Sequence, residues 1–295
     1  MYKIISDSSC DLSPEQIEKY NVHVVPFYLH IEDKEYKENK DIGIREFYQF
    51  MVDHKDIFPK SSTPSVNDYI EAFKLYLDQG MDVICICITI KFSGSYNAAR
   101  LAKEAVEEDY PERKITVINC TFNTVLQGIY TIEAAKMCRA GVGYDQCVDR
   151  LETIKSTGRI FFTVGNFDYL IHGGRIGKVA KVATSLLGIR PLIVLKEGEI
   201  FAFGVSRKRK DSIKRCIKQV MKHIKDNNIN PSDYVYSVGY GYDMEEGPMV
   251  AEMFKEAVLK VYPDAELDIS IMQIGSVISV HTGPYPIGVT VLEKA

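Results

Sequence analysis

Four short polar segments occur where a predicted strand ends or a predicted helix begins, which is where α/β proteins bind ligands. They are residues 6–11, 60–65, 92–96 and 281–284. Hydroxyl groups are frequent in these segments, and hydroxyls together with backbone amides at a helix start can hold a carboxylate or another anion. No metal-ligand spacing is present in the sequence. The residue types therefore favour an anion-binding site built from loops over a metal centre.

The segment Ser93-Gly94-Ser95 gives the strongest signal of the four. It follows a very apolar strand-like run and opens a helical pattern. Gly94 allows a ligand to approach the backbone closely, while the Ser93 hydroxyl and nearby amides can donate to a carboxylate. Lys91 and Phe92 precede Ser93, so the Gly-x-Ser-x-Gly elbow of many hydrolases is absent.

Two of the other segments combine hydroxyls with a helix start or a turn. Ser61, Ser62 and the following Thr63 precede a helical pattern. Helix capping needs only one hydroxyl, so the surplus can bind an anion, with ordinary capping as the alternative. Asp7 and Ser8 follow the opening strand, where they favour an Asx or Ser turn or hydrogen bonding beside the ligand.

The fourth segment contains His281, Thr282 and Gly283, and it follows the alternating run 276–280, which predicts a strand. A lone histidine is more often structural than catalytic, but one at a strand end beside Gly-Pro is well placed to face a cleft. Together with Ser93 it could form a serine–histidine couple, so a serine hydrolase or acyltransferase acting on acyl esters is the alternative function.

Two basic features call for a separate interpretation. Arg175 lies in a glycine-flanked loop, where it is a candidate contact for a phosphate or an acidic partner. Its loop lacks the spacing and the Lys-Ser/Thr ending of a P-loop. The basic run 207–225 indicates a solvated helix face, with partner docking or nucleic-acid-linked regulation as minority alternatives.

The elements that must position these segments alternate between strand and helix patterns, which is typical of an α/β fold with a mainly parallel sheet flanked by helices. A change of pattern near residue 158 predicts a second α/β domain with a mixed sheet, so we expect domains at 1–157 and 158–295. We expect strands at 2–6, 22–30, 82–90, 115–119, 159–164 and 234–239, a hairpin joined at 197–198, three strand runs at the C-terminal end, and helices beginning near 14 and at 66–79, 95–108, 125–140, 144–156, 178–187, 207–225 and 246–261.

Composition narrows the class of protein. The 295 residues carry a net charge of −4, so no overall positive field favours nucleic acid. The seven cysteines form no Cys-x-x-Cys pair, which favours a reducing compartment. No secretion signal and no apolar run of membrane-spanning length is visible. We therefore expect a cytoplasmic protein without stable membrane insertion and without a cofactor.

Taken together and in order, the segments resemble the DegV family of bacterial fatty-acid-binding proteins. The matching stretches are 6–12, 61–65, 93–96, 173–176 and 281–284. The resemblance implies a non-catalytic subunit that holds one long-chain fatty acid between two domains. A separate ATP-binding kinase subunit would phosphorylate the bound carboxylate to an acyl phosphate that feeds phospholipid synthesis.

Carried onto this chain, the resemblance implies that Ser61, Ser62, Ser93, Gly94 and His281 bind the carboxylate. Asp7, Ser8, Thr282 and Gly283 would support them, and Arg175 would contact the kinase subunit. Three positions depart from the family pattern. The hydroxyl segment begins Ser-Ser-Thr, which leaves open whether Ser61 or Ser62 binds, Asn119-Cys120 replaces a frequent Asp-Ser, and Tyr285 follows Pro284 where glycine is common.

Overall fold

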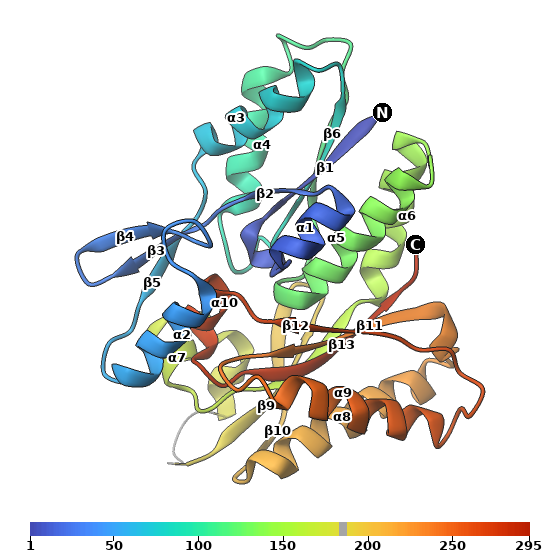
Figure 1. Cartoon of the computed structure of the whole chain (residues 1–295). Coiled ribbons are helices and arrows are strands. Elements are labelled where there is room, and N and C mark those ends of the chain that lie inside the picture. The colour runs from blue at the N-terminus through green and yellow to red at the C-terminus, as the bar shows by residue number, and fades with distance from the viewer. Residues whose placement is uncertain (183–187) are drawn as a thin grey trace.

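The computed structural model describes residues 1–182 and 188–295 (Figure 1). It shows an α/β protein in which a parallel sheet flanked by helices is followed by a second, mixed sheet. This confirms the fold class expected from the sequence. The helix expected at 178–187 extends beyond the described residues, and its described part is the 3-10 helix η3, Gly177–Val182.

The first sheet has the strand order β2-β1-β6-β7, and all of its pairings are parallel. Its strands are rich in isoleucine, valine and cysteine and are mostly buried, as expected for a sheet covered on both faces. The helices α3 and α4 pack against β6 on one side, while α5 packs against β1. The strands are β1 Tyr2–Asp7, β2 His23–Val25, β6 Asp82–Cys87 and β7 Ile115–Asn119.

Five of the six α-helices of this half begin within one residue of the position that the sequence predicted, whereas α2 was not predicted. Ser13 and Ser65 both form complete capping boxes, with Gln16 and Asp68 as the reciprocal partners. Beside these helices lie the 3-10 segments η1 Ser8–Cys10 and η2 Lys155–Thr157. The helices are α1 Pro14–Tyr20, α2 Ile44–Asp53, α3 Val66–Leu77, α4 Ser95–Val106, α5 Thr124–Arg139 and α6 Tyr144–Ile154.

A small antiparallel sheet, β4-β3-β5, corrects two expectations. The single strand expected at 22–30 is divided into β2 and β3, because Pro26 lies between them and has no amide for a sheet ladder. The polar segment at 60–65, expected to be a loop, begins with the strand β5, which pairs with β3. The strands are β3 Tyr28–Ile31, β4 Lys34–Lys37 and β5 Lys60–Ser62.

The second large sheet has the order β10-β9-β8-β13-β11-β12 and combines antiparallel pairings with one parallel pairing, β11 with β12. The helices α8 and α9 pack against it, and α5 contacts β11 and β13, so α5 lies between the two large sheets (Figure 1). The elements are β8 Arg159–Thr163, α7 Asp168–His172, β9 Arg190–Lys196, β10 Glu199–Ser206, α8 Arg209–Asp226, η4 Pro231–Asp233, β11 Tyr234–Tyr240, α9 Glu246–Leu259, β12 Asp268–Gln273 and β13 Ile287–Glu293.

The expected strand at 276–280 is wrong, because these residues begin the helix α10, Ser276–Thr282. Alternating serine and β-branched residues favour a strand when they face solvent on one side. Here residues 276–280 are all buried, so the alternation does not report a solvent-facing side. The helix packs beside α2 and α7 and against β3 and β5. A segment near the C-terminus therefore lies against the N-terminal half of the chain.

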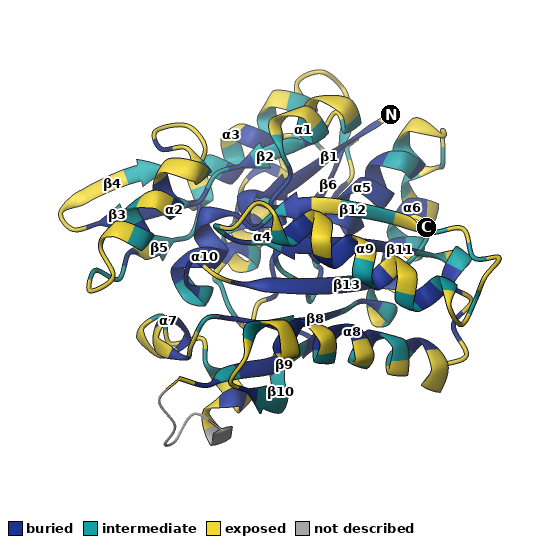
Figure 2. Ribbon diagram, turned by 60° about the horizontal axis from the view of Figure 1, so that its bottom comes forward, coloured by how far each residue is buried: buried dark blue, intermediate teal, exposed yellow. Residues whose placement is uncertain are grey.

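The large sheets separate along the chain at the expected division, since β7 and the strands before it precede residue 158 and β8 follows it. We keep 1–157 and 158–295 as the proposed domains. The buried residues lie along both sheets and α5 (Figure 2). Among residues 1–182 and 188–295, no helix is long and apolar enough to cross a membrane and no cluster of side chains could hold a metal ion.

Candidate ligand-binding site

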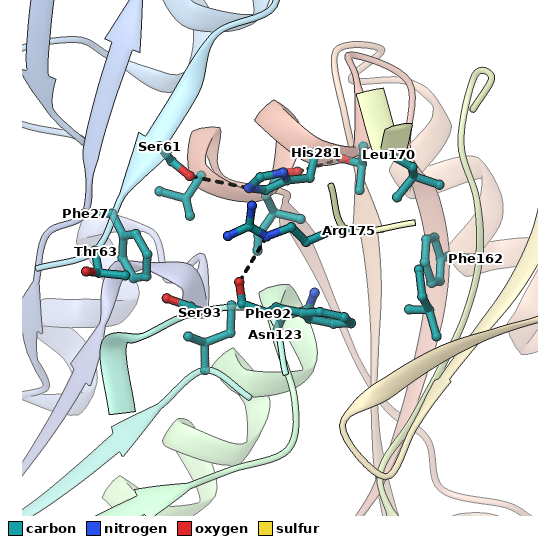
Figure 3. A pocket seen from close by; sticks show the side chains of 15 residues that line it. Phe27, Ser61, Thr63, Phe92, Ser93, Asn123, Phe162, Leu170, Arg175 and His281 are labelled. Carbon is teal, nitrogen blue, oxygen red and sulfur yellow. Dashed lines mark hydrogen bonds between the residues drawn. The ribbon is translucent and has the colours of Figure 1, made fainter. Parts of the chain in front are cut away.

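A cavity lies where the loop after β6, the strand β5 and the helix α10 meet the second large sheet (Figure 3). It offers about 610 Å³ of unfilled space, part of it open to solvent. Polar side chains, including Ser61, His281 and Arg175, gather on one side, and Phe162 and Leu170 lie on the other. The lining residues are Phe27, Ser61, Thr63, Ile88, Phe92, Ser93, Asn123, Phe162, Leu170, Arg175, Ile200, Val277, Ile278, His281 and Thr282.

The strand β5 separates the two serines that the sequence left undistinguished. Successive side chains on a strand point to opposite faces, so Ser61 and Ser62 diverge. Ser61 lines the cavity, whereas the Ser62 hydroxyl lies 2.9 Å from Nε2 of His30 in the neighbouring strand. Thr63 lies two residues beyond Ser61 and also lines the cavity. The structure therefore brings Ser61, and not Ser62, to this site.

Ser93 and Gly94 lie in the loop between β6 and α4. Ser93 lines the cavity, and its hydroxyl oxygen accepts a hydrogen bond of 3.2 Å from the Ser95 amide. Gly94 lines an adjoining surface groove that shares Ser93 and Arg175 with the cavity. The φ angle of Gly94 is −79°, and a Cβ there would approach the protein no closer than 3.9 Å. No described residue crowds a side chain at this position, and the backbone angle does not require glycine. We therefore favour close approach of a ligand as the reason for glycine here.

His281 lies in the last turn of α10 and faces Ser61 across the polar side of the cavity. Its Nε2 is 3.4 Å from the Ser61 hydroxyl, which is long for a hydrogen bond. Its Nδ1 is buried without a hydrogen-bond partner among the described residues. Burial, with a contribution from Arg175, lowers the pKa of His281 to about 4. The imidazole is therefore neutral near pH 7, with hydrogen-bonding capacity that the protein does not use.

The residues after His281 have separate roles in shaping the cavity. Thr282 lines it, and its hydroxyl donates to the Ile278 carbonyl at 3.1 Å. Gly283 has a φ of 75°, and a Cβ there would lie 2.6 Å from the ring of Tyr169. Gly283 therefore supports the site through its backbone conformation, because another residue would be strained and would collide with α7.

Arg175 lies at the rim of the cavity and is exposed to solvent. Its Nε donates to the Phe92 carbonyl at 3.1 Å (Figure 3), and another guanidinium nitrogen donates to the Gly173 carbonyl at 2.7 Å. These bonds connect the loop after α7 to the loop that contains Ser93. The arginine is thus both a surface residue and part of the cavity wall, a combination that the sequence did not predict.

Asp7 and Ser8 lie behind the cavity and do not line it. The carboxylate of Asp7 accepts hydrogen bonds from the hydroxyls of Ser9 and Ser95, both 2.5 Å, from Gln127 and from the Ile88 amide. Burial raises the pKa of Asp7, and the hydroxyl donors counter part of that shift. The bond to Ser95 fixes the start of α4, so Asp7 supports the Ser93 loop indirectly.

A second, more apolar space of about 370 Å³, part of it open to solvent, adjoins the first, and we call it the extension. The two share Asn123, Phe162, Ile278 and Thr282. The extension runs between α5, α10 and the strands β8, β11 and β13, and it is lined by Asn123, Thr124, Val125, Ile160, Phe162, Gly239, Ile274, Ile278, Thr282, Pro286 and Gly288. The first cavity therefore has polar and apolar lining residues together, and the extension is lined mostly by apolar ones.

Sequence reasoning missed the lining residues Asn123 and Phe162. Asn123 follows β7 and precedes α5, so the rule that ligands bind at strand ends could have found it. Phe162 lies within β8, and an aromatic residue in an apolar strand carries no signal that separates core from cavity wall.

The arrangement differs from that of a serine hydrolase. Among the hydrogen bonds of the described residues, none joins Ser93 to His281, and no carboxylate orients the imidazole. A hydrolytic serine needs such a base, and the base needs a group that fixes its orientation.

The basic face of α8 lies outside the cavity. Arg209 forms an ion pair with Glu246 on α9. The residues Lys210, Lys214, Lys218 and Lys222 are exposed along the helix, as expected for a solvated face.

Comparisons with known proteins agree over almost the whole chain. A family model described as "Uncharacterised protein, DegV family" matches residues 1–294. A DegV domain-containing protein of Clostridium perfringens is 29% identical over 285 residues, which cover 96% of this chain and 94% of that relative.

Two solved structures extend the comparison. A stearic acid-binding protein of Eubacterium ventriosum is 43% identical, with a TM-score of 0.93 over 100% of this chain and 99% of that one. The fatty acid kinase B3 protein of Streptococcus pneumoniae, solved with linoleic acid, is 21% identical, with a TM-score of 0.81 and complete coverage of both chains. At that identity the second likeness supports the fold alone.

Proposed function

Because the chain belongs to the DegV family, we propose that it binds one long-chain fatty acid between its two large sheets. It then presents the carboxylate to a separate ATP-binding kinase subunit, which forms an acyl phosphate. The protein itself is a non-catalytic carrier in this proposal. The observation that supports it best is the difference in lining, with serine and histidine in the first cavity and mostly apolar side chains along the extension.

The acyl chain supplies most of the retention. Burying about 16 carbons at about 0.8 kcal/mol per CH₂ gives on the order of 10 kcal/mol before the costs of association. In the proposal the acyl chain passes from the first cavity into the extension, which adjoins it and shares four of its lining residues. A stearic acid-binding protein with 43% identity supports a ligand of this class.

The head group is held by neutral donors. The hydroxyls of Ser61 and Ser93 and the amides near Gly94 donate to the carboxylate, and His281 donates through Nε2 when its proton lies there. Such donors bind an anion without a buried ion pair that would have to break when a mixed anhydride leaves. Ser62 is excluded from this role in the proposal because it faces His30.

Arg175 connects binding to presentation. Its guanidinium is exposed at the rim, where a partner protein can reach it, and a planar fork suits a phosphate or carboxylate of that partner. A kinase subunit as the partner is what membership of the DegV family suggests, and it is part of the proposal. The seven cysteines are free, which fits work in the reducing cytoplasm.

The test is to purify the protein, measure its mass under native conditions and identify any extracted ligand. We expect one fatty acid per chain, because an empty apolar cavity is unfavourable. A ligand-free protein that also takes up no added stearate would contradict the proposal. Ester hydrolysis by the purified protein would favour the hydrolase alternative instead.

A further inference from the structure

A buried carboxylate that lines neither cavity connects several of the segments that do. Glu38 follows β4, is only 1% exposed and forms no ion pair with any residue that the structure describes. Buried acids of this kind are costly unless hydrogen bonds satisfy them, so their contacts show what they hold in place. Nothing in the sequence marked Glu38 as part of the site.

Each oxygen of Glu38 binds a different part of the chain. Oε1 accepts a hydrogen bond of 2.9 Å from the amide of Val277 in the first turn of α10. Oε2 accepts one of 2.5 Å from the Ser8 hydroxyl, whose oxygen in turn accepts the Phe27 amide at 2.9 Å. The backbone of Glu38 also donates to the Phe27 carbonyl at 3.0 Å. Both Val277 and Phe27 line the cavity.

A second buried acid, Asp11, lies beside the same helix end. Its Oδ2 accepts a hydrogen bond from the Thr124 hydroxyl, and its Oδ1 has no hydrogen-bond partner among the described residues. A Cβ built at position 275 would lie 2.3 Å from an Asp11 oxygen and 3.2 Å from Oε1 of Glu38. The two carboxylates therefore close around the start of α10, and Gly275 gives them the room to do so.

The start of α10 determines where His281 lies. Val277 and His281 are four residues apart, so they occupy the same face of the helix, and both line the cavity. The sequence of this segment favours a strand, which makes acceptors for its first amides important for keeping it helical. Burial raises the pKa of Glu38 to about 7, while the Ser8 hydroxyl and the first amides of α10 counter that shift.

We propose that Glu38 is a positioning residue for the head group: by holding the first turn of α10 and, through Ser8, the backbone at Phe27, it places His281 opposite Ser61. This inference rests on the proposed function, because it assigns Glu38 a role in binding the fatty acid. It predicts that the contribution of Glu38 to ligand affinity passes through His281.

The test is a double-mutant cycle on the full chain with stearate as the ligand. Glu38→Ala should lower stearate affinity by about tenfold in the wild-type background and by less than about twofold in the His281→Ala background, because the two residues act as one unit. Glu35→Ala is the control, since Glu35 is exposed on the adjacent strand β4 and should leave affinity unchanged. An equal loss in both backgrounds would overturn the inference.

Two further measurements keep the inference testable if Glu38→Ala does not fold or if stearate does not bind. Ser8→Ala removes one contact of Glu38 and should give the same pattern at about threefold. In ligand-free protein, the pKa of His281 measured by NMR should rise in Ser8→Ala from about 4 toward its ordinary value. The reason is that α10 is held less firmly in this variant, so water reaches the imidazole. An unchanged pKa contradicts positioning by Glu38, whereas failure of the wild type to bind stearate contradicts the proposed function.

Discussion

The loop around Asp7 and the rim of the cavity have similar compositions but opposite states of hydrogen bonding. Asp7 lies in a serine-rich segment at a strand end, and its two oxygens accept four hydrogen bonds. Ser61 and His281 meet at 3.4 Å, and Nδ1 of His281 has no partner among the residues that the structure describes. A cluster that is already satisfied stabilises the fold, whereas the Ser61 hydroxyl and Nε2 of His281, which are only loosely joined at the cavity, are available to a ligand.

The largest expected effect is on the satisfied cluster. Asp7→Asn replaces one carboxylate oxygen, which accepts hydrogen bonds, with an amide group, which donates them. At least two of the four groups that donate to Asp7 would then face another donor in the core. We expect the free energy of unfolding to fall by at least about 3 kcal/mol, measured by urea denaturation. Asp33→Asn in the exposed β3–β4 turn is the control and should change stability little. If Asp7→Asn keeps wild-type stability but loses stearate affinity, Asp7 belongs to the binding site and the comparison fails.

The next effect separates presentation from binding at the rim. Arg175→Ala should reduce acyl-phosphate formation per bound stearate with the partner kinase by about tenfold to a thousandfold, as for a central interface arginine, and should have a smaller effect on stearate occupancy through the lost bond to the Phe92 carbonyl. Arg100→Ala, at an exposed ion pair on α4, is a matched control. Reduced occupancy with unchanged turnover per bound ligand would show that Arg175 serves the cavity instead of the partner.

A smaller effect distinguishes two adjacent serines. Ser61→Ala removes a donor at the cavity and should weaken stearate binding by about tenfold, while the stability of ligand-free protein stays nearly unchanged. Ser62→Ala removes the hydroxyl that faces His30 and should leave affinity at the wild-type level. Titration calorimetry of both variants checks this, and equal losses would mean that the alternation of β5 does not select the head-group donor.

The smallest effect is a pH dependence. In ligand-free protein the lowered pKa of His281 means that its contribution to stability is present above about 6.5 and is lost as pH falls through about 4. A bound carboxylate favours the charged imidazole and raises that pKa, so binding takes up protons. Stearate affinity relative to His281→Asn should therefore increase by about threefold between pH 7 and pH 5. A pH-independent ratio would indicate that the carboxylate does not reach the imidazole.

The sequence predicted the parts of the site that strand ends determine. The loop containing Ser93 follows a continuous apolar run, and such a run ends in a ligand-binding loop in parallel α/β sheets. The capping box at Ser65 was likewise readable, because it depends on residues three positions apart. These features are local, so local patterns were enough to find them.

The parts that depend on distant contacts were not readable. The segment 276–282 has a strand pattern but forms a helix whose Val277 amide donates to Glu38, more than 200 residues earlier. The pairing of β5 with β3 decides that Ser61 faces the cavity. Neither contact can be predicted from the neighbouring sequence, and both determine which side chains lie together at the cavity.

The most direct test of the central claim is a crystal structure of the protein grown with stearate. We expect the carboxylate to lie within hydrogen-bond distance of Ser61 Oγ and His281 Nε2. The acyl chain should pass Phe162 and Ile278 into the apolar extension. A carboxylate placed at the far end of the extension, or stearate bound only outside the two cavities, would contradict it.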